Sequence, residues 1–311
     1  EVVGGEGSDL ESILKELDKD LKDKYEFAFC VKTLTNPFFA NIDNGLKDMV
    51  RKSDKVTTLE CNNDAGTQLN VCEDIANGGY DLCFLTPIDY EGVSAALKSL
   101  QNAGVKVVLV DSLAADMSLT DGSSVSDNFQ AGVLAGEACV KALKKKYGEE
   151  KGQVVIFENT TSPPVRDRVA GFESIISKYS GIEIAHRENG KGQIDTGMIA
   201  MDNFLQAVPE MDAVFSMNDP SAQGCANAIE AAGRTGEILV YGVDGSTESK
   251  EYIKDGKQDG SSCQFPFTMG QEAIVLAYRI LAGQTLSESE RNIKIPCEWI
   301  DIDNVAEYID Q

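Results

Sequence analysis

Histidine, tryptophan and positive charge are scarce in this sequence of 311 residues. It contains one histidine, His186, and one tryptophan, Trp299, and its 28 basic residues stand against 51 acidic ones, for a formal charge of −23. A surface this acidic repels phosphate backbones and anionic lipid, so we expect no nucleic-acid partner. No Gly-x-Ser-x-Gly, Walker or HExxH motif occurs, so the common short catalytic motifs are missing.

Long hydrophobic runs and closely spaced cysteines are also missing. No run approaches the roughly 20 apolar residues that span a bilayer, and no basic region followed by an apolar core marks a signal peptide. The eight cysteines are well separated, which argues against a zinc site. We expect most of them to be buried thiols, with a disulfide among some of them as the alternative. We predict no cofactor and no metal.

The segment before the first expected strand is a polar leader, residues 1–24. Its apolar positions follow helical spacing and predict a short amphipathic helix; they are Leu10, Ile13, Leu14, Leu17 and Leu21. Two roles are open for this helix, a tether to a membrane anchor or packing against the body of the protein.

From Tyr25 onward, short apolar strands alternate with helical stretches in two consecutive series. The expected strands are 27–31, 56–59, 82–85 and 105–110, then 154–157, 182–185, 214–217 and 238–243. The expected helices are 38–51, 68–76 and 93–103, then 131–146, 165–178, 196–207, 221–232 and 248–254. Such alternation predicts parallel sheets with right-handed crossovers.

Two series of this kind predict an α/β protein with two doubly wound, Rossmann-like lobes. In such folds ligands bind beyond the carboxyl ends of the strands. Polar residues follow strands in both series: Asn36 and Asp111 in the first, Asn218 and Asp244 in the second. We therefore expect the functional residues at these strand ends.

Six short segments carry a family resemblance by their order and spacing. They are Lys32 to Phe39, Val110 to Ser112, Pro164 to Arg168, Phe215 to Asp219, Gly242 to Gly245, and Ser262 to Gln264. Together they resemble the ribose-, allose- and galactose-binding proteins of the type I periplasmic binding family, over about residues 25 to 300.

The resemblance implies a two-lobed binding protein with a hinge of several strands. Its lobes would comprise residues 25–126 plus 265–293 and residues 127–264 plus 294–311, with chain crossings near Asp127, Gln264 and Lys294. It would capture a monosaccharide by hinge closure and deliver it to the permease of an ABC transporter. We expect an aldohexose first, then a deoxyhexose or polyol, then a pentose. The expected protein is bacterial, monomeric, not an enzyme, and either periplasmic or a cell-surface lipoprotein.

The resemblance also implies the ligand contacts. A sugar presents apolar C–H faces and a rim of hydroxyls, which suits aromatic rings together with carboxylates, amides and arginine. Phe38 and Phe39 would supply the aromatic side, and Lys32 could reach a pyranose oxygen. The hydroxyls would be held by Asn36, Asp111, Arg166, Asn218, Asp244 and Gln264.

Each of these assignments has a structural alternative. One of the two phenylalanines could be core, Asn36 could shape the turn before Pro37, and Asn218 could cap a helix. Asp244 could be a turn residue or a cap, and Arg166 could be a surface charge.

The sequence also departs from the family pattern. Ser112 stands where many relatives place an arginine, Thr86 replaces an asparagine of ribose-type pockets, and Lys191 lies near the position of a missing stacking aromatic. The calcium loop of galactose-binding relatives is absent.

Three other functions are compatible with a fold of this kind. A sensor would present bound sugar to a chemoreceptor or a kinase. A glycosidase would use Asp111 and Asp244 across a scissile bond. A repressor core would need an N-terminal helix-turn-helix of roughly 50–60 residues, and only the 24-residue leader precedes the first strand.

Overall fold

The computed structural model describes residues 7–308, and the chain divides into two compact lobes. Within the described residues, the first lobe runs to Ser126 and again from Phe265 to Ile295, and the second lobe comprises Asp127–Gln264 and the segment from Pro296. The third crossing was expected near Lys294. It falls after Ile295, because Ile295 still pairs with Ser126 in the first sheet.

The first lobe is built on a six-stranded sheet in the order β11-β5-β4-β3-β1-β2. Its strands are β1 (Glu26–Val31), β2 (Lys55–Glu60), β3 (Leu82–Leu85), β4 (Lys106–Val110), β5 (Gly122–Ser126) and β11 (Asn292–Ile295). Every neighbouring pair is parallel. The strand order reverses between β1 and β3, which is where doubly wound sheets bind ligands.

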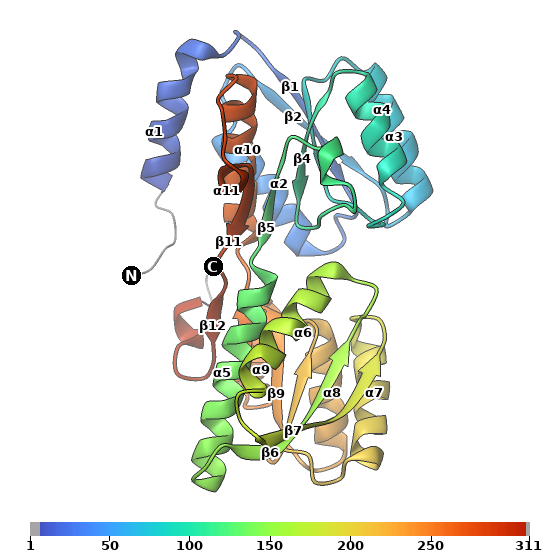
Figure 1. Cartoon of the computed structure of the whole chain (residues 1–311), viewed down its shortest axis with the longest axis vertical. Helices are drawn as coiled ribbons and strands as arrows, with labels where there is room; N and C mark the ends of the chain where they lie inside the picture. The colour runs from blue at the N-terminus through green and yellow to red at the C-terminus, as the bar shows by residue number, and fades with distance from the viewer. Residues whose placement is uncertain (1–6, 309–311) are drawn as a thin grey trace. The chain divides into compact units, whose positions relative to one another are not determined.

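Two helix pairs cover this sheet, one on each face (Figure 1). Helices α2 (Pro37–Met49) and α10 (Pro266–Leu281) pack on one face, and α3 (Ala65–Asn77) and α4 (Ser94–Asn102) pack on the other. Successive side chains of β1 point to opposite faces of the sheet. Phe27 and Phe29 therefore pack with α2 and α10, and Ala28 and Cys30 pack with α3 and α4. The sheet is therefore buried on both sides.

The polar leader packs against the first lobe. Helix α1 (Gly7–Leu17) lies beside α10 (Figure 1), and the side chains of Leu10 and Leu17 are buried in the same core cluster as α2 and α10. Of the two roles that the sequence leaves open for this helix, the structure supports packing against the body.

The second lobe repeats the design with the sheet order β12-β10-β9-β8-β6-β7. Its strands are β6 (Lys151–Glu158), β7 (Gly181–Asn189), β8 (Ala213–Ser216), β9 (Leu239–Asp244), β10 (Gly260–Cys263) and β12 (Glu298–Ile300). All neighbours are parallel except β12, which runs antiparallel to β10. The order reverses between β6 and β8, and this second reversal confirms the predicted pair of doubly wound lobes.

The helices of the second lobe also pack in pairs (Figure 1). Helix α5 (Asn128–Tyr147) contacts α6 (Pro163–Ile176), and α7 (Ile194–Ala207) contacts α8 (Asp219–Ala231). The approach of α5 to α6 needs a glycine, because a Cβ on Gly132 would lie 1.8 Å from the carbonyl oxygen of Arg168. Helix α9 (Thr247–Lys254) follows β9, and the remaining short helices are α11 (Glu288–Arg291), η1 (Asp18–Asp20), η2 (Met117–Leu119) and η3 (Val305–Tyr308).

All eight cysteines are buried and none forms a disulfide in this structure, whereas the sequence led us to expect most of them to be buried thiols. Three of them meet in the first lobe, where Cys30 Sγ lies 3.4 Å from Cys61 Sγ and 3.8 Å from Cys72 Sγ. None of the helices within residues 7–308 combines the length and apolar character needed to cross a membrane.

Candidate functional site

In the first lobe, an ion pair joins the carboxyl ends of β1 and β4. Lys32 directly follows β1 and Asp111 directly follows β4, and Lys32 Nζ lies 3.0 Å from Asp111 Oδ2. Ser112 Oγ donates a hydrogen bond to the same carboxylate oxygen at 2.8 Å and accepts one from Lys32 Nζ at 3.3 Å. The two charged side chains remain 20% and 17% exposed, so both can still bind a ligand.

The backbone at Asp111 has an unusual conformation. Its φ is +69°, and the N–H of Ser112 donates to the carbonyl of Val110 at 2.8 Å, which closes a three-residue turn around Asp111. Few non-glycine residues adopt a positive φ, because the side chain crowds the backbone. Such strain is concentrated at functional sites, so the turn marks Asp111 as a functional candidate.

Thr86 and Gln68 hold the backbone of Lys32, one member of this ion pair, in place by hydrogen bonds. The fully buried Thr86 hydroxyl accepts a hydrogen bond from the backbone N–H of Lys32 at 2.7 Å. Gln68 in turn donates to the carbonyl of Thr86 at 3.0 Å and accepts from the N–H of Ile88 at 3.0 Å. Thr86 therefore positions the segment after β1, although the sequence suggests it only as a replacement for a pocket asparagine.

The aromatic pair and Asn36 lie at the start of α2. Asn36 is exposed and caps the helix, since its Oδ1 accepts from the N–H of Phe38 at 2.9 Å. Phe39 is only 7% exposed and belongs to the core, and Lys32 Nζ lies 5.1 Å from its ring centroid. Phe38 is half-buried, so it keeps more surface for a ligand than Phe39 does.

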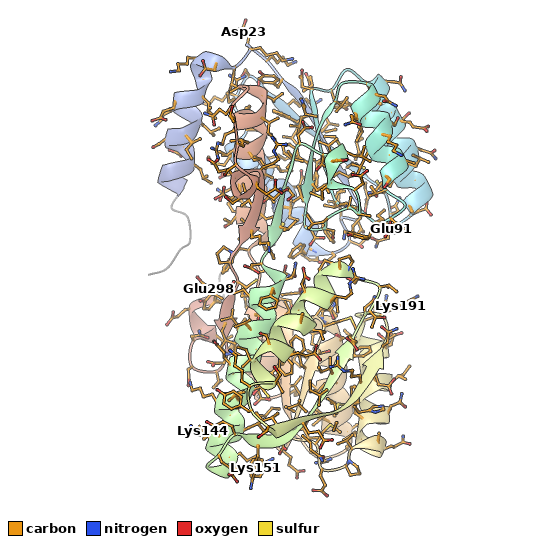
Figure 2. The ribbon with its side chains drawn as sticks, viewed as in Figure 1. Asp23, Glu91, Lys144, Lys151, Lys191 and Glu298 are labelled. Atoms are coloured by element: carbon orange, nitrogen blue, oxygen red, sulfur yellow. The ribbon has the colours of Figure 1, made fainter. Side chains whose placement is uncertain are left out.

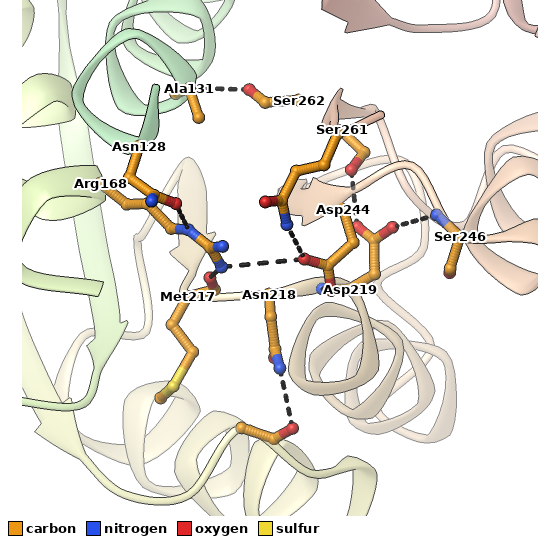
Figure 3. Close-up of polar contacts among 12 residues, drawn as sticks. Asn128, Ala131, Arg168, Met217, Asn218, Asp219, Asp244, Ser246, Ser261 and Ser262 are labelled. Atoms are coloured by element: carbon orange, nitrogen blue, oxygen red, sulfur yellow. Dashed lines mark hydrogen bonds and ion pairs between the residues drawn. The ribbon is translucent and has the colours of Figure 1, made fainter. Parts of the chain in front are cut away.

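In the second lobe, Asp244 stands at the centre of a polar cluster at the end of β9 (Figure 3). Gln264 Nε2 donates to Asp244 Oδ1 at 2.7 Å, and Arg168 Nη1 lies 3.8 Å from the same oxygen. The other carboxylate oxygen accepts a longer hydrogen bond, 3.4 Å, from the N–H of Asp219. Of the predicted site residues, the structure thus brings Asp244 and Gln264 together.

Asp244 also has a strained backbone and a perturbed ionisation. Its φ is +138°, so both lobes place a positive-φ aspartate at the end of a strand. Burial raises the pKa of Asp244 to about 7; the positive charge of Arg168 opposes this effect, and the nearby Asp219 carboxylate adds to it. The side chain is 24% exposed, so a ligand can still reach it.

The arginine that contacts Asp244 is Arg168, which the sequence reasoning did not select. Arg168 is 8% exposed, its Nε donates to Asn128 Oδ1 at 2.9 Å and its Nη1 donates to the carbonyl of Met217 at 2.8 Å (Figure 3). The predicted Arg166 lies in the first turn of α6 with an exposed side chain. Residues two positions apart on an α-helix are rotated by about 200° around its axis, so the two arginines point in nearly opposite directions.

Asn218 and Lys191 lie at the edge of the second-lobe cluster. Asn218 caps α8, because its Oδ1 accepts from both the N–H and the hydroxyl of Ser221, at 3.2 and 2.6 Å. Its Nδ2 donates to the carbonyl of Gly192 at 3.0 Å. This hydrogen bond connects the helix cap to the loop Gly190-Lys191-Gly192. Lys191 of that loop is exposed and projects from the lobe (Figure 2). The capping role that the sequence allowed for Asn218 is therefore present.

Asp219, the residue after Asn218, lies buried beneath the polar residues around Asp244. It is fully buried, and its carboxylate accepts hydrogen bonds from the N–H of Ser246 at 2.8 Å and from the hydroxyl of Ser261 at 2.7 Å. Burial raises its pKa. Asp219 thus fixes the loop after β9 and, through its own N–H, the orientation of Asp244. Within residues 7–308, no group of three or more acidic, cysteine or histidine residues is arranged to hold a metal ion.

Comparison with known proteins identifies one family over most of the chain. The family model described as a periplasmic binding protein domain matches residues 27–285. The chain is 29% identical over 271 residues to the ribose import binding protein RbsB of Bacillus subtilis (strain 168), covering 86% of this chain and 85% of that protein. It is 27% identical over 299 residues to the D-ribose/D-allose-binding protein of Pseudomonas aeruginosa, covering 92% of each.

Solved structures share the fold. The chain is similar to an ABC transporter solute-binding protein of Bacillus halodurans C-125 with bound myo-inositol, at a TM-score of 0.82 and 22% identity, covering 92% of this chain and 97% of that one. It is also similar to one from Mycobacterium smegmatis with bound glycerol, at a TM-score of 0.81 and 25% identity, covering 93% and 98%.

Proposed function

Because this chain belongs to the periplasmic binding protein domain family, we propose that it is the solute-binding component of an ABC importer and that it binds a monosaccharide. The curated relatives are named as binding proteins for ribose or for ribose and allose, and this supports a binding role over a catalytic one. The family also places the protein outside the cytoplasmic membrane, and we propose that it delivers its ligand to a permease in that membrane.

The observation that carries this proposal is the repeated aspartate at a strand end. Asp111 after β4 and Asp244 at the end of β9 both have a positive φ, and each lies beside a basic side chain, Lys32 and Arg168. These positions are the carboxyl ends of parallel strands, where doubly wound sheets bind ligands. Each aspartate thus offers carboxylate oxygens where a ligand is expected.

The chemistry of these groups suits hydroxyls. A carboxylate has about four lone-pair sites, so Asp111 and Asp244 can accept sugar O–H groups in addition to the hydrogen bonds they already make. We propose that Lys32, the exposed Arg166 and Asn36, and the amides of Asn218 and Gln264 supply further polar contacts. Phe38 would lie against an apolar C–H face of the sugar, and Phe39 would support it from the core.

A panel of thermal shifts tests the function. Bound ligand is first removed by unfolding and refolding, and the protein is then heated with monosaccharides, deoxysugars and polyols. A ligand at 100 times its dissociation constant stabilises the native state by about 2.7 kcal/mol, which corresponds to a shift of several degrees. We expect a clear shift for at least one aldohexose or related sugar, and an empty panel would contradict the proposal.

Variants then connect the shift to the site. Asp244→Ala and Arg166→Ala should abolish it, because each removes a proposed hydroxyl contact. Asp202→Ala is the matched control, since Asp202 is an exposed aspartate on α7, and it should bind as the wild type does. Equal binding by all three variants would show that the ligand binds elsewhere.

A further inference from the structure

The second lobe contains a groove beside α5, here called the α5 groove, that lies away from the polar residues around Asp244. Its volume is about 1010 Å³, and its lining includes one face of α5, Leu239 and Tyr241 of β9, and residues of the segment 299–303, which begins in β12. Strand β12 lies beside α5 (Figure 1). Leu239 begins β9 and Asp244 ends it, and five residues of extended chain span about 16 Å. The α5 groove is therefore separate from the candidate sugar site.

The hydroxyl of Tyr241 is a buried polar group in this groove without a protein partner. Tyr241 is only 2% exposed, and no hydrogen bond from the part of the chain that the structure describes reaches its hydroxyl. Burial raises the pKa of Tyr241 well above its ordinary value, so the hydroxyl keeps its proton and can both donate and accept. Buried tyrosine hydroxyls normally have a partner. A bound ligand would supply the one that is missing here.

Two carboxylates near the Tyr241 hydroxyl lack a basic partner. Asp259 and Asp301 line the groove and lie close enough to act electrostatically on Tyr241. Asp259 accepts from the N–H of Val240 at 2.8 Å, and Asp301 accepts from the indole Nε1 of Trp299 at 3.0 Å. Neither takes part in an ion pair within residues 7–308. Burial raises the pKa of Asp259 to about 6, and no positive charge opposes this effect. A cation bound here would gain the attraction of both carboxylates.

The groove also offers apolar surface beside these carboxylates. The rings of Tyr241 and Trp299 lie 5.7 Å apart, centroid to centroid, and Trp299 is half-buried. Leu134 of α5 and Leu239 are also half-buried, and Ile302 is exposed. Aromatic faces attract both apolar groups and cations. The volume is at the upper end of the roughly 300–1,000 Å³ that is typical of small-molecule sites.

The balance of charge in the groove favours a cation over an anion. Its lining includes seven carboxylates and four basic side chains. Two of the basic side chains are already paired, Lys146 with Asp212 at 2.7 Å and Arg234 with Glu237 at 3.0 Å. The other two are exposed on α5. An anionic ligand would meet the excess of carboxylates, and a cationic one is attracted by it.

We propose that the α5 groove is a second ligand site, which binds an organic cation: an amine with an apolar body. The ammonium group would lie between the carboxylates of Asp259 and Asp301 and donate to the hydroxyl oxygen of Tyr241. The apolar body would lie against Trp299 and Leu239. The site does not depend on the proposed sugar function, because it shares no residue with the cluster around Asp244.

The single tryptophan of the chain makes the test direct. Trp299 lines the groove, so its fluorescence reports on occupancy. The protein is titrated with phenethylamine, and with phenylpropionate and phenylethanol as an acid and a neutral alcohol of similar size. We expect a saturable change with phenethylamine, at a dissociation constant about tenfold or more below those of the other two, because hydrogen bonds to charged groups are worth at least that factor. Equal or tighter binding of the acid or the alcohol, or no saturable change with any of the three, would overturn the proposal.

Variants then locate the amine. Asp259→Asn should weaken phenethylamine binding by about tenfold or more, and Asp202→Asn is the matched control, an exposed aspartate on α7. Tyr241→Phe should weaken it by about two- to tenfold without lowering the Tm, because the hydroxyl has no protein partner to lose. Its control is Tyr179→Phe, a half-buried tyrosine of the same lobe outside the groove. Wild-type binding by both Asp259→Asn and Tyr241→Phe would refute the assignment to this groove.

A last pair of measurements separates this site from the sugar site. Asp244→Ala should bind phenethylamine as the wild type does, and Asp259→Asn should bind the best sugar of the panel as the wild type does. Loss of amine binding in Asp244→Ala with intact binding in Asp259→Asn would place the amine in the sugar site and overturn this inference. Binding of phenethylamine by a protein that binds no sugar would support the second site and contradict only the proposed function.

Discussion

Replacing Asp111 with glycine should weaken ligand binding while leaving the protein about as stable as before. The aspartate has a φ of +69°, a conformation that glycine adopts without steric cost. Relief of this strain is worth about 1 kcal/mol or somewhat more. The substitution also loses the partly exposed ion pair with Lys32, which contributes about 0–1 kcal/mol, and gives the unfolded chain extra freedom worth about 0.5–1 kcal/mol. These effects nearly cancel, so the free energy of unfolding should stay within about 1 kcal/mol of wild type.

Binding should respond very differently to the same substitution. A hydrogen bond to a charged group contributes about 1.5–3 kcal/mol, so the loss of the Asp111 carboxylate should weaken sugar binding by about ten- to 150-fold. Calorimetry with the best sugar of the panel and urea unfolding of the ligand-free protein measure the two quantities. Asp111→Asn is the control for charge, because asparagine also tolerates a positive φ. Binding by Asp111→Gly as tight as wild type, or a loss of several kcal/mol of stability, would refute this reasoning.

Three further predictions concern ionisation, thiols and packing. The folded-state pKa of Asp244 is raised to about 7, so its contribution to stability is fully present below the ordinary value near 4 and is lost as pH rises through about 7; urea unfolding should show this loss between pH 5 and 8 and a smaller one in Asp244→Asn. A thiol reagent should titrate all eight cysteines in denaturant and almost none in the native state, and fewer than eight would reveal a disulfide. Gly132→Ala should lower the unfolding free energy by about 1–3 kcal/mol or more, because its Cβ would clash with the carbonyl of Arg168, whereas Gly66→Ala on α3 meets nothing closer than 3.4 Å and should be neutral or stabilising.

The strands that the sequence predicts are those with apolar runs. Each expected strand is present in the structure within a few residues, for example β3 at Leu82–Leu85 and β8 at Ala213–Ser216. Strands β5 and β10 escape this reasoning, because their sequences are GSSVS and GSSC. They are nevertheless fully buried, and several of their serine hydroxyls have hydrogen-bond partners inside the lobe: Ser124 donates to the carbonyl of Met269 and Ser262 to that of Ala131. A buried strand rich in serine lacks the hydrophobic pattern from which strands are predicted.

For the site, the sequence indicates which residues lie at strand ends but not which residues contact them. Residues at strand ends could be selected from the sequence, because the end of a parallel strand is a fixed place in the fold. Their partners could not, because Arg168 reaches Asp244, and Asn128 reaches Arg168, from helices that lie far from Asp244 in the chain. The sequence Arg166-Asp167-Arg168 offers two arginines on opposite sides of one helix, and only tertiary packing decides which one faces Asp244.

The charges at the two strand ends bear on the class of ligand. Within the first lobe Lys32 offsets Asp111, and within the second lobe Arg168 offsets Asp244. A ligand with its own carboxylate or phosphate would compete with these aspartates for the two basic groups and would be repelled by the aspartates themselves. An uncharged polyol disturbs neither pair, because its hydroxyls can donate to the carboxylate oxygens of both aspartates. The arrangement therefore favours a neutral sugar over a sugar acid or a sugar phosphate.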